Sequence, residues 1–385
     1  MRHRRIAIIG MVAAFAGSPA PGQEPELARL KGHVETLASP GFEGRRDAGA
    51  AKARAYLIEE FRKLGLEPLF GESYTQDIPG QGAEGVIGVN VGARIVGADP
   101  AARDRWIILG AHYDHLGRRG DVIYPGADDN ASGVALMLEV ARSMARSGEK
   151  PRRSMMFVGF DLEERGPKGE FGLRGSRHFA KAPPVPLDRV GLFVTADMIG
   201  RSLGGVCGDL VFALGSEREP AVRPWIARGA EGKPLRVGLL GSDILGIDRS
   251  DYGPFRARQV PYLFFTTGEN PRYHSPEDRA ETIDYPKLEA ISRVILGVVR
   301  EAARSEVELA WDPSPEASVV EALTLRDVFR TLIDHRDELK VGPYQLTMMR
   351  GAIQAIDGIE GRHAITPAER SRLIRVAQVV LFTVF

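Results

Sequence analysis

Cysteine is almost missing from this sequence of 385 residues, in which Cys207 stands alone. A single cysteine excludes an intrachain disulfide and a metal site built from thiolates. A chain of this length can bury a core large enough to be stable without disulfides, even outside the cytoplasm. Because Cys207 has apolar neighbours, it is expected to be a packed side chain and not a catalytic nucleophile.

An excess of charge of either sign is missing as well. The 51 basic residues are balanced by 51 acidic ones, so the formal net charge is zero. Proteins that bind nucleic acid use a basic excess to neutralise its phosphates, so nucleic acid is not an expected partner. A mean hydropathy of −0.16 excludes a polytopic membrane protein. The function must therefore be sought in local motifs.

The apolar run at the N-terminus is short. Ile6–Phe15 follows the basic segment Met1–Arg5 and has about half of the roughly 20 residues that a membrane-spanning helix needs. Small residues follow, with Ala14–Ala16 and Ser18–Ala20 as candidate cleavage triplets. We expect residues 1–22 to be a signal peptide, removed during export to the periplasm or the exterior, with no membrane span left afterwards. Retention by an uncleaved signal is the alternative.

What the chain does contain is a regular alternation of strand-like and helix-like segments. Two helical segments and a Val- and Ile-rich segment expected to be an edge strand, Gly85–Gly97, come first. The strand-like runs that follow are Trp106–Gly110, Met155–Phe160, Val190–Thr195, Leu210–Leu214, Val237–Leu240 and Pro261–Thr266. The helical segments between and after them are Ala131–Met144, Phe171–Phe179, Tyr252–Arg258 and Tyr285–Ala303. This alternation predicts an α/β fold with a mixed, mainly parallel central sheet and helices on both faces.

The pattern changes after a linker at Asp312–Pro315. Residues 312–385 show only helical spacing, and Thr366 followed by Pro367 and Glu369 reads as a capping box that opens the last helix. We expect a catalytic domain over residues 23–311 and a small helical C-terminal extension over residues 312–385. The apolar end, Val379–Phe385, is too short to span a membrane and is expected to pack on the main domain.

Histidines and carboxylates stand where three of the predicted strands end. His112 and Asp114 follow the first, Glu163 and Glu164 the second, and Asp197 the third. Parallel strands deliver such groups to one edge of a sheet, where ligands bind. A cluster of nitrogen and oxygen donors suits Zn²⁺, with Co²⁺ or Mn²⁺ as possible substitutes.

Two further segments add donors of the same kind. One is Gly126–Gly133, which contains Asp128 and Asp129 just before a helix, and the other is Tyr273–Ser275 around His274. Each element alone is weak, because an isolated His-x-Asp is usually a surface pair and Asp-Asp-Asn is a common helix cap. All five in order, at strand ends and at a helix start, predict a metal site.

With these motifs the sequence resembles the M28 family of co-catalytic zinc peptidases. The resemblance covers about residues 25–305 and implies a zinc exopeptidase-like fold. The segments that match the family's signatures are Gly110–Gly117, Gly126–Gly133, Asp161–Glu164, Asp197–Gly200, Ser250–Phe255 and Tyr273–Ser275. No ligand that the family requires is missing, and residues 312–385 lie outside the resemblance.

The resemblance implies two zinc ions per chain. Carried over residue by residue, it makes Asp129 the ligand that bridges both ions. His112 and Asp197 complete one ion, and Glu164 and His274 complete the other. Two cations about 3.5–4 Å apart need such a bridging carboxylate, and together they acidify a water molecule and polarise a carbonyl.

The resemblance also implies the groups that act beside the metals. Glu163 is the general base that passes the proton of the water to the leaving amine. Asp114 is the carboxylate that orients His112 from behind. Tyr273, just before the ligand His274, helps to stabilise the oxyanion.

Some assignments stay open at this point. Asp128 is the alternative to Asp129 as the bridging residue, and His115 is the alternative to His112. Asn130–Ser132 also matches a glycosylation acceptor, which we set aside because the metal site needs this segment buried. No motif specifies the oligomeric state, the side-chain preference or the role of the extension.

The main functional hypothesis is a metallo-aminopeptidase that acts on peptide substrates. A free α-amine would be held by carboxylates, with Glu163 and Asp197 as the candidates. The pocket rim is expected from Arg201–Cys207 and Ile244–Tyr252. A carboxypeptidase-type exopeptidase is one alternative. Another is glutaminyl cyclase, a one-zinc acyltransferase on the same scaffold, whose members usually carry Trp at the position of Tyr273. A non-catalytic binding module would be expected to lack ligands, and none is missing here.

Overall fold

The computed structural model describes residues 24–80, 85–166, 172–315, 317–359, 361–362 and 364–385. The predicted signal peptide, residues 1–22, lies outside the described residues. Among the helices that the structure describes, none is long and apolar enough to cross a membrane.

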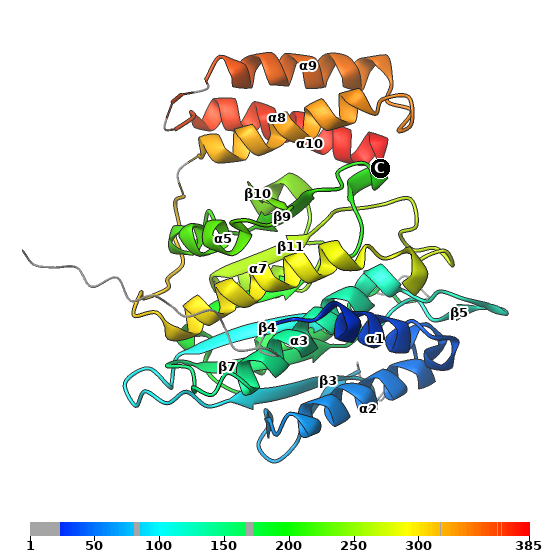
Figure 1. The fold of residues 1–385 in the computed structure, drawn as a ribbon, viewed down its shortest axis with the longest axis vertical. Helices are drawn as coiled ribbons and strands as arrows, with labels where there is room; N and C mark the ends of the chain where they lie inside the picture. The colour runs from blue at the N-terminus through cyan, green and yellow to red at the C-terminus, as the bar shows by residue number, and fades with distance from the viewer. Residues whose placement is uncertain (1–23, 81–84, 167–171, 316, 360, 363) are drawn as a thin grey trace, which may run out of the picture.

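A mixed sheet of nine strands forms the centre of the molecule (Figure 1). Its strands, in spatial order, are β1 (Glu67–Pro68), β3 (Val86–Ile95), β7 (Ser154–Phe160), β4 (Trp106–His112), β8 (Val190–Ala196), β11 (Tyr262–Thr266), β9 (Leu210–Leu214) and β10 (Arg236–Leu240), with β2 (Thr75–Pro79) also paired to β3. Strands β7, β4, β8 and β11 run parallel to one another. The four strands are buried along their length except at Gly191. Their sequences are continuous apolar runs because helices cover both faces of the sheet.

Helices cover both faces of the sheet, which confirms the predicted fold class. The first face carries α1 (Leu27–Leu37), α2 (Ala48–Lys63), α3 (Gly133–Ala145), α5 (Arg223–Ala230) and α7 (Tyr285–Arg304). The opposite face carries α4 (Arg174–Lys181), α6 (Tyr252–Arg256) and the C-terminal helices. Helix α7 illustrates why. Five of its apolar side chains recur at helical spacing and are fully buried: Leu288, Ile291, Val294, Ile295 and Val298. Asp284 caps the start of the helix by accepting from Lys287 N–H at 3.0 Å.

Strand β3 differs from its expectation. The segment Gly85–Gly97 was predicted as an edge strand, but β3 lies inside the sheet, between β7 on one side and β1 and β2 on the other. Strand β1 escapes prediction because its two residues cannot show a period-two pattern, and β2 because only one of its five residues, Ile78, is buried. The structure also contains a small hairpin of β5 (Arg118–Arg119) and β6 (Val122–Ile123). Helix α4 begins at Arg174, later than predicted, and Phe171 lies outside the described residues.

The extension is a stack of three helices beside β9 and β10 (Figure 1). They are α8 (Val319–Asp334), α9 (Pro343–Asp357) and α10 (Pro367–Val384). Their apolar side chains join the same hydrophobic core as Phe212, Leu240 and Phe264 of the sheet. The predicted capping box is present at the start of α10. Val380 is buried in this core, so the apolar end packs on the main domain.

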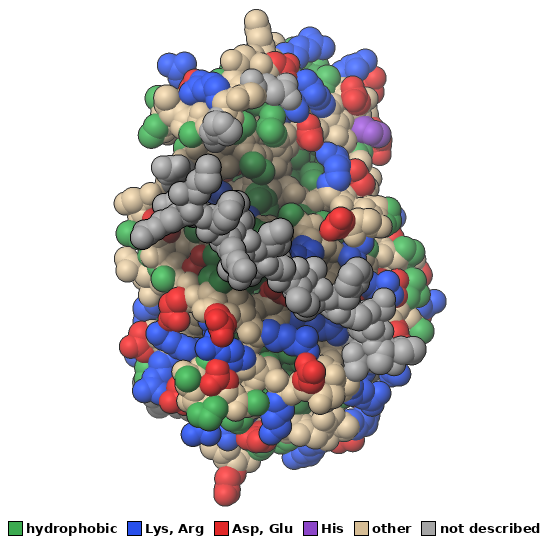
Figure 2. Space-filling model, turned by 60° about the vertical axis from the view of Figure 1, so that its left-hand side comes forward, with side chains coloured by type: hydrophobic (Ala, Val, Ile, Leu, Met, Phe, Trp, Pro, Cys, Tyr) green, Lys and Arg blue, Asp and Glu red, His purple; other side chains and the backbone are tan. Residues whose placement is uncertain are grey.

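Charges of both signs are mixed over the surface. Figure 2 shows Lys and Arg side chains interspersed with Asp and Glu on the face that it presents. This mixing agrees with the formal net charge of zero.

Candidate metal centre

Three neighbouring parallel strands bring the candidate ligands to one edge of the sheet. β4 ends at His112, β7 leads into Asp161–Glu164, and β8 leads into Asp197. Because β4 pairs with both β7 and β8, their carboxyl ends lie next to one another. The remaining candidates come from the turn Ala127–Ser132 before α3 and from the loop after β11.

His112, Asp129 and Asp197 form a first group of donors that could hold a metal ion. Nε2 of His112 lies 3.3 Å from Oδ1 of Asp129 and 3.4 Å from Oδ1 of Asp197. All three residues are buried. Nε2 of His112 and Oδ1 of Asp197 have no hydrogen-bond partner among the described residues. Buried donors and acceptors are rarely left unpaired, so these atoms fit a cation between them.

A second group lies on the other side of Asp129. Nε2 of His274 is 3.1 Å from Oδ2 of Asp129 and 3.2 Å from Oε1 of Glu164. The two carboxylate oxygens of Asp129 therefore contact different histidines, Oδ1 facing His112 and Oδ2 facing His274. This is the arrangement that a carboxylate shared by two cations requires.

His115 belongs to the second group, although the sequence placed it only as a substitute for His112. Its Nδ1 lies 3.0 Å from Oε1 of Glu164 and 3.8 Å from Oδ2 of Asp129. These three residues form a compact, buried set of donors. The second group thus offers two histidines, His115 and His274, where the family resemblance implied one.

Asp128, the open alternative to Asp129, is engaged elsewhere. Its carboxylate accepts hydrogen bonds from Gly200 N–H at 2.6 Å and from Asn270 Nδ2 at 3.1 Å, and it lies 3.8 Å from the guanidinium of Arg201. It belongs to neither of the two donor groups. These contacts make Asp128 a support for the loops around the site.

Glu163 and Asp114 are linked through the backbone. The carboxylate of Asp114 accepts the N–H groups of Glu163 and Glu164 at 3.1 and 3.2 Å. Its Oδ1 is 3.6 Å from Nδ1 of His112, and its carbonyl oxygen is 3.2 Å from the same nitrogen. Asp114 therefore positions the two glutamates as well as touching His112. The pKa of Glu163 is raised well above its ordinary value by burial and by the nearby carboxylates of Glu164 and Asp197, against the opposing effect of His112.

Tyr273 lies against the second group. Its ring stacks on the ring of His274, with centroids 3.8 Å apart and an angle of 22° between the planes. Burial, with the charges of Asp129 and Glu164, raises the pKa of the Tyr273 phenol. The hydroxyl therefore stays protonated in the neutral range and is available as a hydrogen-bond donor at the wall of the cavity.

Arg45 is a supporting residue that the sequence did not reveal. Its side chain is fully buried and donates hydrogen bonds to the carbonyl oxygens of Tyr113, Pro125, Gly126 and Asp129, at 2.6–3.1 Å. It thereby joins the loop after β4 to the turn that carries Asp129. Buried hydrogen bonds to a charged group contribute about 1.5–3 kcal/mol each, so this guanidinium holds the two loops firmly.

The backbone around the site adopts unusual angles. Leu162, Met198 and His274 have positive φ values of 56°, 54° and 52° although none is glycine. Two of them adjoin the candidate residues Glu163 and Asp197, and the third is itself a candidate. Such conformations cost about 1–3 kcal/mol each and tend to cluster at functional sites.

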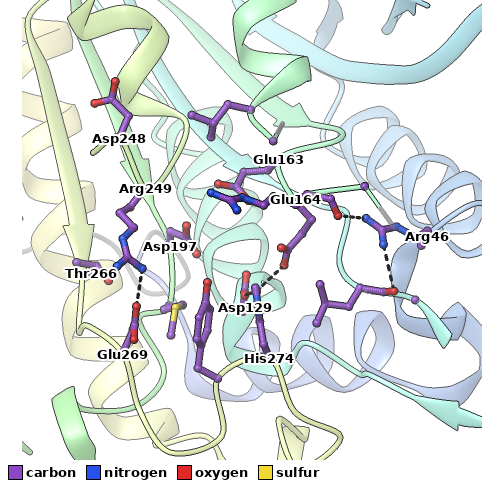
Figure 3. A pocket seen from close by; sticks show the side chains of 18 of the residues that line it. Arg46, Asp129, Glu163, Glu164, Asp197, Asp248, Arg249, Thr266, Glu269 and His274 are labelled. Atoms are coloured by element: carbon purple, nitrogen blue, oxygen red, sulfur yellow. Dashed lines mark hydrogen bonds and ion pairs between the residues drawn. The ribbon is translucent and has the colours of Figure 1, made fainter. Parts of the chain in front are cut away.

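A cavity of about 1310 Å³ opens onto both donor groups. Figure 3 shows Glu163, Glu164, Asp197 and Asp129 directed toward one another at its floor, with His274 beside them. The predicted rim is right in part: Leu245 and Ile247–Arg249 line the cavity, whereas no residue of Arg201–Cys207 is among its described lining residues. Cys207 is buried, and burial raises the pKa of its thiol to about 11, which does not suit a nucleophile. Asn130 is fully buried, as the metal site requires.

The comparisons with known proteins agree with this geometry. A model described as peptidase family M28 matches residues 90–299. Aminopeptidase YwaD of Bacillus subtilis (strain 168) is 24% identical over 335 residues, an alignment that spans 77% of this chain and 68% of that protein.

Two solved structures share the fold. A Zn-dependent exopeptidase from Parabacteroides distasonis aligns with a TM-score of 0.56 at 20% identity, over 72% of this chain and 98% of its own. A glutaminyl cyclase from an Acidobacteriales bacterium aligns with a TM-score of 0.59 at 21% identity, over 76% of this chain and 99% of its own. At such identities the likeness concerns the fold alone, and both kinds of chemistry are represented on it.

Proposed function

The chain belongs to peptidase family M28, and from this premise we propose that it is a metallo-aminopeptidase that uses two zinc ions. Peptide substrates follow from the family. The single observation that carries the two-metal proposal is the placement of Asp129, whose two oxygens lie 3.3 and 3.1 Å from the imidazoles of His112 and His274. A one-metal enzyme has no need of such a shared carboxylate.

We assign the ligands by these contacts. His112, Asp129 and Asp197 would hold one ion, and Asp129, Glu164 and His274 the other, with His115 beside the second. The chemistry that zinc supplies when bound is polarisation of the scissile carbonyl and acidification of water. All donors are nitrogen or oxygen atoms, which suit zinc.

The side chains that are not ligands carry the proton and the charge. Glu163 lines the cavity without belonging to either donor group, so its carboxylate is free to take the proton of the attacking water and deliver it to the leaving amine. The Tyr273 hydroxyl donates to the oxygen on which negative charge develops. Asp114 keeps Glu163 in place through its backbone N–H.

The preference for an N-terminus follows from the carboxylates. Glu163 and Asp197 both face the cavity, and a positively charged α-amine is the part of a peptide that such groups attract. A carboxypeptidase would need a fixed cation at the same depth. Of the arginines that line the cavity, Arg46 and Arg249 are bound to Arg165 O and Glu269.

The test is hydrolysis of aminoacyl p-nitroanilides by the purified protein without residues 1–22. It would be assayed after chelation and after zinc add-back, with zinc content measured in parallel and Glu163→Gln as the inactive control. Zinc-dependent release of p-nitroaniline that is lost in the control supports the proposal. A protein that holds two zinc ions and hydrolyses no substrate would refute it.

Glutaminyl cyclisation is the second candidate, because a glutaminyl cyclase shares the fold at a TM-score of 0.59. The same preparation incubated with glutaminyl peptides distinguishes the two. Ammonia release without hydrolysis would favour the cyclase. The presence of two donor groups, where a one-zinc enzyme needs only one, argues against it.

We also propose that residues 1–22 direct export and are then removed. The basic start and the short apolar run support this. N-terminal sequencing of the protein recovered outside the cytoplasm tests it, and recovery of the whole chain inside the cell would contradict it.

A further inference from the structure

The C-terminal extension reaches the cavity of the metal centre. Leu381, in the last turn of α10, lines this cavity together with Leu245, Ile247 and Phe264 of the main domain. Leu381 lies 107 positions after His274, the last of the candidate ligands in the sequence. The extension is therefore part of the wall around the candidate active site.

The contact is fixed by ion pairs on one side of α10. Arg370 donates to both oxygens of Asp243, at 2.6 and 2.7 Å, and to both oxygens of Glu321, at 2.5 and 2.8 Å. Gln378 donates to the carbonyl oxygen of Asp243 at 2.9 Å, one turn before Leu381. Because Asp243 lies in the segment that leads to Leu245, these bonds fix the position of α10 relative to the rim of the cavity.

The last turn of α10 also touches the rim further along. The ring of Phe382 lies 5.6 Å from the guanidinium of Arg249, which donates to Glu269 at 2.6 Å. A side-chain carbon added at Gly204 would come within 2.5 Å of Phe385, so glycine is required there, also because its φ is +59°. The end of the chain thus packs against Arg249, which lines the cavity, and against a second loop at Gly204, which does not line it.

The wall around Ile247 and Phe382 exposes apolar side chains, and the charged side chains next to them are paired. Arg249 is paired with Glu269, and Asp248 is paired with Arg256 at 3.0 Å. Ile247 and Phe382 are nevertheless 57% and 53% exposed. Large apolar side chains grouped at the mouth of a cavity mark a binding surface, and the ligand they favour is apolar.

We propose that Leu381 and Phe382 of the extension, with Leu245 and Ile247, form a subsite for an apolar side chain of the peptide. The extension then determines which peptides are cleaved, a role that rests on the proposed peptidase function. An apolar pocket of this kind discriminates by roughly 10- to 200-fold between side chains that fill it and those that do not.

Two variants that place opposite charges at position 381 test the proposal. The full chain carrying Leu381→Glu or Leu381→Arg is compared with wild type on substrates that vary in the first and second side chains. We expect kcat/KM for leucyl and phenylalanyl substrates to fall about tenfold or more in both variants. Basic side chains should gain with Leu381→Glu and acidic ones with Leu381→Arg, while zinc content stays unchanged.

Arg375→Glu is the matched control, because Arg375 is exposed on the same helix, and it should keep the wild-type profile. Both Leu381 variants keeping that profile, with normal folding and zinc content, would overturn the proposal. If the wild type cleaves nothing, the peptidase function fails. Peptide affinities measured by calorimetry then decide the subsite, since equal binding of leucyl and lysyl peptides to wild type and Leu381→Glu would overturn it.

Discussion

Nδ1 of His115 lies 3.0 Å from Oε1 of Glu164, and neither ring nitrogen of this buried histidine has a hydrogen-bond partner among the described residues. His112, a predicted ligand, shows the same combination of close carboxylates and an unpaired Nε2. The similarity indicates that His115 faces the second donor group as His112 faces the first.

Replacing His115 by Asn should weaken zinc binding. Whether the imidazole contacts the ion or fixes Glu164, its loss is expected to lower zinc affinity by about 10- to 100-fold. Competition with a chromophoric chelator measures this. His335→Asn is the control, because His335 is exposed on the extension, remote from both donor groups. Equal zinc affinity in all three proteins would show that His115 contributes nothing to the site.

Replacing Glu163 by Gln should abolish catalysis and spare the metals. Gln keeps the shape but cannot accept the proton of water, so kcat should fall by about 10²–10⁴-fold. Zinc content should remain that of wild type, because Glu163 belongs to neither donor group. Steady-state kinetics with metal analysis on the same sample checks both points. Loss of a zinc ion in this variant would instead make Glu163 a ligand.

Stability should decrease between acidic and neutral pH through Glu217. Burial raises the pKa of this carboxyl from 4.5 to about 7, with smaller contributions from Glu321 and Asp243. The folded protein therefore holds a proton that the unfolded chain has already released. As pH rises from 4.5 through 7, the free energy of unfolding should fall by up to about 3 kcal/mol.

Glu217→Gln removes this titration, so its unfolding curve should change less over the same pH range. Urea unfolding at pH 5 and pH 7.5, in wild type and variant, gives the comparison. Parallel pH dependence in the two proteins would assign the effect to other groups.

Removing the side chain of Arg370 should loosen the extension. Arg370→Ala leaves the buried carboxylate of Glu321 with only the N–H of Gly241 as a donor among the contacts described. The expected loss is about 2 kcal/mol of unfolding free energy. Arg372→Ala, on the exposed side of α10, should stay within about 0.5 kcal/mol of wild type. Similar unfolding midpoints for both variants would show that this ion-pair cluster does not hold the helix.

The sequence was sufficient for the fold class, and it named the residues that meet at the sheet edge. His112, Glu164 and Asp197 follow apolar runs that had to be buried parallel strands, and the carboxyl ends of such strands meet. The strand count was less accessible, because β1 has only two residues, too few to display a pattern.

The roles of Arg45 and Leu381 were not predicted from the sequence, for a different reason. An arginine between glycine and another arginine reads as a surface residue, and only the folded chain supplies the carbonyl oxygens that surround Arg45. The segment that contains Leu381 was correctly expected to pack on the main domain, but its position in the wall of the cavity was not expected. Both depend on contacts between segments far apart in sequence, which local patterns do not encode.

Because the ligands come from separate segments of the chain, the site can form only at a late stage of folding. His112 and His274 are 162 positions apart in the sequence, and the donors meet only after β4, β7, β8 and β11 have paired. Contacts of such sequence separation form late in folding. A chain still in the course of folding thus has no assembled donor groups, and any metal-dependent activity of this site can arise only once the sheet has formed.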